Sequence, residues 1–320
     1  MKGDSSHWKS LTQIAFLAAV AFSLGNFPAT GATITLNPSA DTFISETYSS
    51  NNFGTVLFFN SGTTQNHFNN RGLIQFDIAG AIPPGAKIKS ANLTVECVGS
   101  PPPDENPPPA RLNLHRALKS WGEGDKLSPT NCTSCAGQGA IATTNEATWY
   151  FRHAFTSNAW VTAGGAMNSD YLPSASSGVT VYTENESPYT MTSTAQLVAD
   201  VQLWLDNPTT NFGWFVVCQQ EGTIFTARRI ASREDTNNAP RLQINYLVPP
   251  VIEKIQKVAG QFTLWFTAQA AQTYEVQFRT NLTSAPWQTL ATFGPSPSTT
   301  PVAIIDAVAL PQRYYRLLSY

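Results

Sequence analysis

Apolar and polar residues alternate along most of this chain, which is the period-two pattern of strands with one buried face. The segment GLIQFDI places Ile74, Phe76 and Ile78 on one face and polar side chains on the other. The same alternation recurs in ANLTVECV, RLNLHRAL and RLQINY, whereas GWFVVCQQ is apolar on both faces, as a central strand requires. With turn residues such as Pro83 and Pro84 between these runs, the pattern predicts an all-β fold of sheets packed face to face.

One segment has helical periodicity instead. Residues 193–207 read STAQLVADVQLWLDN, with apolar side chains spaced three and four apart from Leu197 to Leu205. Ser193 or Thr194 is a candidate N-cap, and a proline follows the segment. We expect one short helix that closes an end of the sandwich.

A domain boundary is predicted at Val248-Pro249-Pro250. A second and shorter alternating series follows it, in FTLWFTA, TYEVQF, VAIID and RYYRLL. The proline-rich run PPPDENPPP is a stiff loop and not a boundary, because the strand pattern resumes at once. We predict a large β-sandwich over residues 33–247 and a second small β-sandwich domain over residues 251–320.

The N-terminal segment has the pattern of a secretory signal peptide. Lys2 and Lys9 supply positive charge, Leu11 to Leu24 form an apolar run, and small residues precede a predicted cleavage after Ala32. The run contains a glutamine and is shorter than the roughly 20 residues that a membrane span needs, which argues against an anchor. We expect residues 1–32 to be removed and the mature protein to be secreted, extracellular and free of the membrane.

Composition narrows the class of partner. Of the 320 residues, 42% are apolar and only 12% are charged, and the formal net charge is −2. Abundant Ser, Thr, Asn, Gly and Pro are typical of extracellular β-rich proteins. A basic surface that would attract nucleic acid or anionic lipid is not expected at this charge. An anionic ligand would therefore have to be held by a local cluster of arginines.

The chain has four cysteines, and export would permit disulfides. Cys132 and Cys135 form a C-x-x-C in the loop NCTSCAGQG, without the two further ligands of a zinc site. A small loop-closing disulfide is the favoured interpretation. Cys97 and Cys218 lie in apolar strand patterns, and they either pair across a sheet or remain buried thiols.

Several motifs occur in an order typical of one known family. They are ADTFISETYSSNNFGT at 40–55, RGLIQFDI at 71–78, IPPGAKIKSANLTV at 82–95, SWGEG at 120–124, AWVTAGG at 159–165 and SREDTNNAPRLQINY at 232–246. Over about residues 33–247 the chain therefore resembles the DNRLRE domain family, which includes family 96 of the carbohydrate-binding modules. The C-x-x-C loop and the length of segment 120–190 depart from the pattern of that family.

The resemblance implies a jelly-roll-type β-sandwich. It also implies a non-catalytic module of secreted bacterial proteins, with binding of acidic polysaccharide such as alginate in some members. The second alternating series, which closes with RYYRL, resembles a short Fn3/Ig-like sandwich.

The charges near the end of the first domain have two interpretations. In the favoured one, Arg233, Glu234 and Asp235 end a strand and pair with one another at the tip of a hairpin. In the other, Arg228, Arg229 and Arg233 bind sugar carboxylates, since a planar guanidinium can hold a carboxylate through two parallel hydrogen bonds. Because neighbouring residues of a strand point to opposite faces, only one of Arg228 and Arg229 can point into a groove.

Among the aromatic residues, Tyr48 and Trp160 are those we expect to be exposed, where they could stack on sugar rings. Trp121, Trp149 and Trp204 lie in contexts that suit anchoring in a core.

Two further polar residues are candidates for binding. Arg152 lies beside His153 and near Tyr150, a weak version of the arginine and base that a uronate lyase requires. Asp41 is a candidate ligand of a structural calcium ion, or it bonds to nearby backbone amides. One carboxylate does not define a calcium site, which takes about 6–8 oxygen ligands. No other cofactor is expected.

Catalytic motifs are missing from the sequence. It contains no G-x-S-x-G, no H-E-x-x-H and no phosphate-binding loop. Nothing pairs its carboxylates as glycoside hydrolysis would require. We therefore predict a non-catalytic protein that binds an acidic, uronate-type polysaccharide. The alternative is a structural or adhesive extracellular protein whose sandwiches act as spacers or contact other extracellular proteins.

Overall fold

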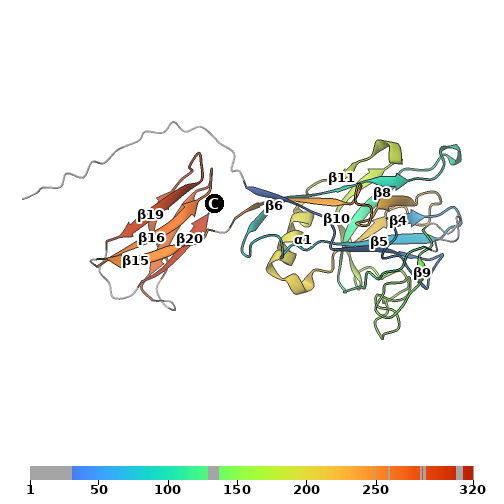
Figure 1. Ribbon diagram of the computed structural model, residues 1–320, viewed down its shortest axis with the longest axis horizontal. Helices are drawn as coiled ribbons and strands as arrows, with labels where there is room; N and C mark the ends of the chain where they lie inside the picture. The colour runs from blue at the N-terminus through green and yellow to red at the C-terminus, as the bar shows by residue number, and fades with distance from the viewer. Residues whose placement is uncertain are drawn as a thin grey trace, which may run out of the picture.

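Over the residues that it describes, the computed structural model is all-β with one short α-helix, which confirms the predicted fold class (Figure 1). It describes residues 31–128, 137–248, 250–258, 260–281, 283, 286–307 and 313–319. The predicted signal peptide, apart from its last two residues, and the predicted pair Cys132 and Cys135 lie outside these ranges. Within them, no helix has the length and apolarity needed to cross a membrane.

Two antiparallel sheets form the larger sandwich. The first orders its strands β1 (Ala32–Leu36), β14 (Arg241–Leu247), β6 (Lys87–Val95) and β11 (Tyr189–Met191). The second orders β10 (Tyr171–Val181), β8 (Ala110–Ala117), β12 (Trp214–Cys218), β5 (Asn69–Gln75), β4 (Phe58–Thr63), β13 (Arg228–Ala231) and β7 (Cys97–Gly99), and β2 (Ala40–Ser45) also pairs with β5. Neighbouring strands come from distant parts of the chain, which is the crossover connectivity of jelly rolls.

Short elements complete this sandwich. They are the ribbon of β3 (Asn51–Asn52) and β9 (Ala140–Ile141), the helix α1 (Ala195–Asp206), and the 3₁₀ turns η1 (Pro103–Glu105), η2 (Glu184–Glu186) and η3 (Pro208–Thr210). The predicted cap of the helix is correct, because the Thr194 side chain accepts a hydrogen bond from the Leu197 amide. The helix packs against β6 and β10, and the ring of Trp204 meets that of Trp214 edge-on at 4.4 Å between centroids.

The larger sheet buries both of its faces, and so the sandwich has two cores. Along β12, Trp214 and Val216 belong to the core between the sheets, while Phe215 and Val217 belong to a second core on the outer face. The long segment between β8 and β10 covers this outer face and inserts Trp121, Trp149 and Trp160 into it; with Phe215 and Val217 they form one cluster. A strand that is apolar on both faces requires such a cover.

This arrangement overturns one prediction. Trp160 is buried, with 4% of its surface exposed, and does not offer its ring to a ligand. Its ring lies edge-on to Phe215 at 5.2 Å between centroids, and its Nε1 donates to the Thr148 carbonyl at 2.9 Å. The outer face of the sheet is apolar, so the tryptophans of the covering segment are used to bury it. The core role expected for Trp121, Trp149 and Trp204 is confirmed.

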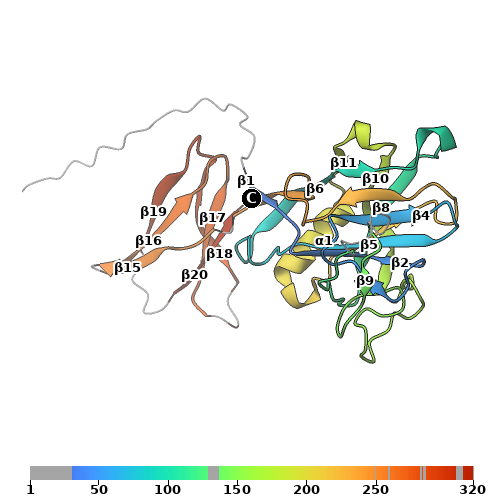
Figure 2. The same cartoon turned by 45° about the vertical axis from the view of Figure 1, so that its right-hand side comes forward.

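The C-terminal strands form two three-stranded sheets with their own core (Figures 1 and 2). One orders β15 (Lys254–Val258), β16 (Gln261–Ala268) and β19 (Thr300–Asp306), and the other orders β18 (Gln288–Phe293), β17 (Tyr274–Arg279) and β20 (Tyr314–Ser319). Leu264, Phe266, Tyr274 and Val276 meet in that core. The last strand of the larger sandwich ends at Leu247, before β15 begins.

The second core can be tested through Trp160. Replacing this buried ring in Trp160→Ala should lower the free energy of unfolding by about 3–5 kcal/mol, since both packing and a hydrogen bond are lost. The matched control is Phe155→Ala in the same segment. The Phe155 side chain is 72% exposed, so this variant should change the free energy of unfolding by less than about 0.5 kcal/mol. Urea unfolding monitored by fluorescence measures both. Equal losses in the two variants would contradict the burial described here.

Candidate functional site

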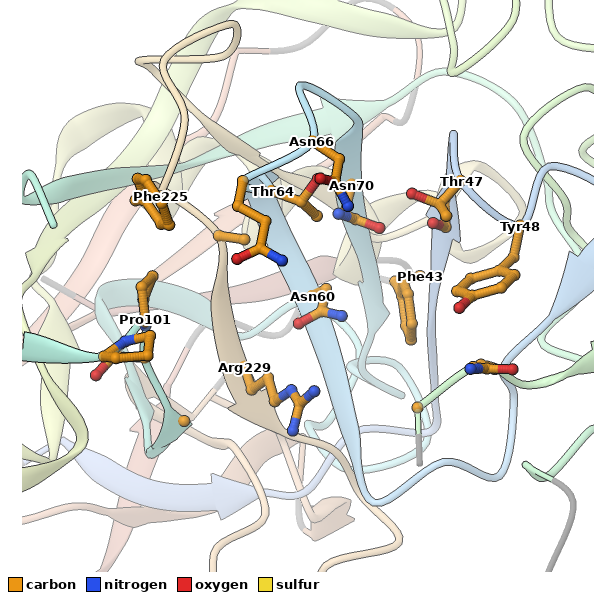
Figure 3. A pocket seen from close by; sticks show the side chains of 18 residues that line it. Phe43, Thr47, Tyr48, Asn60, Thr64, Asn66, Asn70, Pro101, Phe225 and Arg229 are labelled. Carbon is orange, nitrogen blue, oxygen red and sulfur yellow. The ribbon is translucent and has the colours of Figure 1, made fainter. Parts of the chain in front are cut away.

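An open groove of about 520 Å³ lies over the larger sheet, beside β2, β4, β5 and β13 (Figure 3). Its walls include the turn between β4 and β5, the segment after β7 and the segment before β13. The lining residues are Phe43, Ser45, Thr47, Tyr48, Asn60, Thr64, Gln65, Asn66, Asn70, Gly99, Ser100, Pro101, Pro102, Gly137, Gln138, Phe225, Ala227 and Arg229.

Hydroxyl and amide groups dominate this lining. The side chains of Ser45, Thr47, Asn60, Gln65 and Asn66 make no hydrogen bond with any described residue. Hydroxyl and amide groups can each donate and accept. Sugar hydroxyls do the same, so the groove presents uncommitted partners of the kind that a carbohydrate offers.

Aromatic side chains supply the apolar part of the groove. Phe43 is buried at its floor and stacks on Phe53 with 3.9 Å between ring centroids, while Tyr48 is half-buried in the wall. Phe225, half-buried on the opposite side, has a φ of 61°, in the left-handed region that such residues seldom adopt. A strained residue of this kind persists only where its surroundings hold it.

Arg228 supplies part of that hold, and it does so from inside the protein. Its guanidinium is almost fully buried and donates to the carbonyl oxygens of Phe225 at 3.0 Å, Ala227 at 3.2 Å, Tyr182 at 2.9 Å and Pro108 at 2.8 Å. Burial lowers the pKa of this guanidinium. The prediction that Arg228 contacts a ligand is therefore wrong, because each of its three side-chain nitrogens bonds to a backbone carbonyl inside the protein.

Arg229 is the member of the pair that faces outward, as the alternation along a strand requires. It is exposed and lines the groove (Figure 3). Its Cζ lies 4.6 Å from the centroid of the Phe58 ring. The guanidinium makes no hydrogen bond or ion pair with the described residues. Its N–H groups are thus available to an acceptor in the groove.

The charges after β13 form a separate cluster. Arg233 Nε lies 2.9 Å from Glu123 Oε1 and 3.0 Å from Glu234 Oε1, and its backbone amide donates to Asp41 Oδ2 at 2.8 Å. Asp235 accepts hydrogen bonds from backbone amides of the following turn. The pairing expected between Arg233 and Glu234 is present, and Arg233 does not line the groove.

Asp41 and Glu123 are unusual carboxyl groups. Burial raises the pKa of Asp41 well above its ordinary value, and the nearby Glu234 raises it further. Burial likewise raises the pKa of Glu123, whose Oε1 accepts a hydrogen bond from the Asp41 amide at 2.8 Å. Asp41 thus bonds to a backbone amide, the second of its two expected roles. Across the described residues, no three His, Cys, Asp or Glu side chains gather as metal ligands.

Arg152, another predicted ligand residue, lies away from the groove in the segment that covers the second core. It donates to the carbonyl and the hydroxyl of Ser120 and to Asn158 Oδ1. Tyr48 is the one predicted aromatic residue that lines the groove, together with Arg229. Cys97 and Cys218 are buried free thiols, and burial raises the pKa of each.

The sequence interpretation missed most of the groove. Asn60, Asn66 and Asn70 come from strands and a turn whose polar residues look like ordinary solvent-facing positions. The signal that was available is the density of amides in SGTTQNHFNN, residues 61–70, which is higher than a hairpin needs. Phe225 had no comparable signal, because its position depends on the distant carbonyl contacts of Arg228.

The larger unit is thus an antiparallel sandwich with an amide-lined groove beside aromatic rings. Residues 32–123 match the family model of carbohydrate-binding module family 96. The match includes Tyr48 and the groove residues of β2, β4 and β5, and it confirms the family that the sequence motifs resemble. A search of the curated proteins finds no match.

The two neighbouring arginines allow a matched stability test. Arg228→Met leaves four carbonyl oxygens without their donor and should lower the free energy of unfolding by about 2–4 kcal/mol. Arg229→Met removes only an exposed guanidinium from the face of the Phe58 ring and should lower the free energy of unfolding by less than about 1 kcal/mol. Urea unfolding measures both, and equal stabilities of the two variants would contradict the bracing role of Arg228.

The raised pKa of Asp41 predicts a pH dependence. In the unfolded chain the pKa of this group is about 3.9. Between that value and the raised pKa of the folded state, the folded protein binds more protons than the unfolded chain does. Stability is therefore lost as pH rises from about 4 through the raised pKa. Asp41→Asn should flatten this fall in a series of urea unfolding measurements at different pH values.

The control for this experiment is Asp77→Asn. Asp77 is exposed and accepts a hydrogen bond from the Gly80 amide, which an asparagine can also do. Its pH profile should match that of the unmodified protein. If stability falls with pH as steeply in Asp41→Asn as in the unmodified protein, the buried carboxyl of Asp41 does not cause the fall.

Proposed function

We propose that this chain is a secreted, non-catalytic protein that binds an acidic polysaccharide in the groove over the larger sheet. The observation that carries the proposal is the occurrence, in one groove, of hydroxyl and amide groups without hydrogen-bond partners and of an arginine without a counter-ion, both judged among the described residues. The match to a carbohydrate-binding family over residues 32–123 supports the general class of ligand.

Neutral parts of the sugar are held by the polar walls. Asn60, Gln65 and Asn66 offer amides, while Ser45 and Thr47 offer hydroxyls. Each can exchange hydrogen bonds with water for hydrogen bonds with sugar hydroxyls at little net cost. The rings of Tyr48 and Phe225 lie on different sides of the groove and can cover the apolar faces of sugar rings (Figure 3).

The preference for an acidic sugar comes from Arg229. None of the described lining residues is Asp or Glu, so no acidic side chain of the groove neutralises this guanidinium. The Phe58 ring covers one face of the Arg229 guanidinium and leaves the edge of this planar group for a ligand. A uronate carboxylate fits that edge through two parallel hydrogen bonds.

The same lining supports a non-catalytic role. The described lining residues include no carboxyl, imidazole or thiol group. Glycoside hydrolysis uses two carboxyl groups about 5–10 Å apart. Arg152, His153 and Tyr150, the weak lyase-like set in the sequence, do not line the groove. Secretion is supported by the signal-like N-terminal sequence.

Affinity electrophoresis of the full chain tests the proposal, with polygalacturonate or alginate against neutral dextran. Arg229→Gln should weaken binding to the uronate polymers about 10-fold or more and reduce its salt sensitivity. Asn60→Ala should weaken binding less, since one neutral hydrogen-bonding group is lost.

The matched control is Arg241→Gln, which removes an exposed arginine from the other sheet of the sandwich. Its binding should equal that of the unmodified protein. Equal binding by Arg229→Gln and Arg241→Gln would remove the groove from the proposal. No retardation by any polymer would favour a structural or adhesive protein, the alternative role.

A further inference from the structure

A second pair of arginines lies on the C-terminal sandwich, outside the groove. Arg279 on β17 and Arg316 on β20 each place Cζ 4.4 Å from the centroid of the Trp287 ring. In the pairing of these strands, Gln277 lies opposite Arg316 and Val276 opposite Leu317. Since Val276 and Leu317 contribute to the core, the alternation along the strands places both arginines on the outer face of the sheet.

The charge of this part of the chain is unlike that of the rest. Residues 251–320 contain five Lys and Arg against three Asp and Glu, whereas residues 33–250 contain twelve against seventeen. Residues 251–320 therefore carry a net charge of +2, and residues 33–250 carry one of −5. The C-terminal sandwich is thus the cationic part of an anionic protein.

Two of the three acidic side chains of this part form hydrogen bonds or ion pairs with groups other than these arginines, although Glu275 lies on the same outer face and bonds to Gln277. Asp306 pairs with Arg313 and accepts a hydrogen bond from the Tyr315 hydroxyl at 2.8 Å. Glu275 accepts hydrogen bonds from Gln277 Nε2 at 2.7 Å and from the Thr289 hydroxyl. Neither Arg279 nor Arg316 forms an ion pair with a described residue.

Both guanidinium groups have N–H donors that make no hydrogen bond with a described residue. Arg316 Nε donates to Gln277 Oε1 at 2.7 Å, which orients the side chain and leaves its terminal nitrogens without a partner among the described residues. Arg279 Nε is buried and out of reach of a ligand, so its terminal nitrogens, which make no hydrogen bond with a described residue, are the available donors. Contact with the indole uses the face of a guanidinium, whereas oxyanions bind along its edge.

We infer that Arg279, Arg316 and Trp287 form a second binding site for acidic polysaccharide, which recognises carboxylate or sulfate groups of the sugar. The choice of a polysaccharide rests on the function proposed for the groove; the anion specificity rests on the two arginines. A polymer that engages the groove and this surface at once gains avidity, because the second contact is intramolecular.

Titration calorimetry with a short oligogalacturonate counts the sites on the full chain. The unmodified protein should bind two per chain, and both Arg229→Gln and the double variant Arg279→Gln/Arg316→Gln should bind one. In affinity electrophoresis on polygalacturonate, the double variant should lose about tenfold or more in apparent affinity. Dextran sulfate in a parallel gel separates recognition of sulfate from recognition of carboxylate.

The matched control is Lys254→Gln/Lys257→Gln, which removes the same charge from the other sheet. These lysines also lie over aromatic rings, at 5.0 Å from the centroids of Trp265 and Phe262. The control should bind two oligosaccharides and keep its affinity for the polymer. If it loses as much affinity as the arginine variant, the effect is one of net charge and the second site is refuted.

The outcomes separate this inference from the proposed function. One site in the unmodified protein, lost only in Arg229→Gln, would refute the second site and leave the groove. One site lost only in the double arginine variant would refute the groove and retain the C-terminal surface. Stronger binding of the protein to double-stranded DNA than to the uronate polymer, lost in the double arginine variant, would show that the ligand is not a polysaccharide.

Discussion

One wall of the groove depends on a buried cation, Arg228, which forms no ion pair with a described residue and interacts only at longer range with Glu184. The guanidinium of Arg228 is held by four carbonyl oxygens from three segments of the chain, which contribute Pro108, Tyr182, and Phe225 with Ala227. Because a guanidinium stays protonated, a loss of these acceptors would destabilise the fold, since an unpaired buried charge is costly. The arrangement joins three separate segments behind the groove wall and holds Phe225 in its strained conformation. The next residue, Arg229, points to the opposite side of the strand, where it lines the groove.

The larger sheet is used on both faces, and this determines where a ligand can bind. The segment between β8 and β10 covers most of the outer face with Trp121, Trp149 and Trp160. The groove lies instead beside β2, β4 and β13, where amides and hydroxyls take the place of apolar residues. Trp160, the tryptophan expected to stack on sugar, therefore packs in a core, and smaller polar side chains line the groove.

Local pattern was enough to predict the strands, the helix and its Thr194 cap, because alternation and capping depend on residues close in sequence. It also restricted Arg228 and Arg229 to opposite faces, but it could not say which one was buried. That choice depends on carbonyls from residues 108, 182, 225 and 227, which only the fold brings together. Trp160 was misassigned for the same reason, since the sheet face it covers belongs to distant strands. The amides of the groove escaped notice because each one alone resembles a solvent-facing residue.

The first and last strands of the larger sandwich are neighbours. In the pairing of β1 with β14, Ala32 lies opposite Tyr246, so the sandwich begins and ends side by side on one sheet while the groove lies over the other. A unit with adjacent ends can be joined to other segments without opening its interior. Flanking domains can thus attach at one edge of the larger sandwich and leave the sheet that carries the groove accessible.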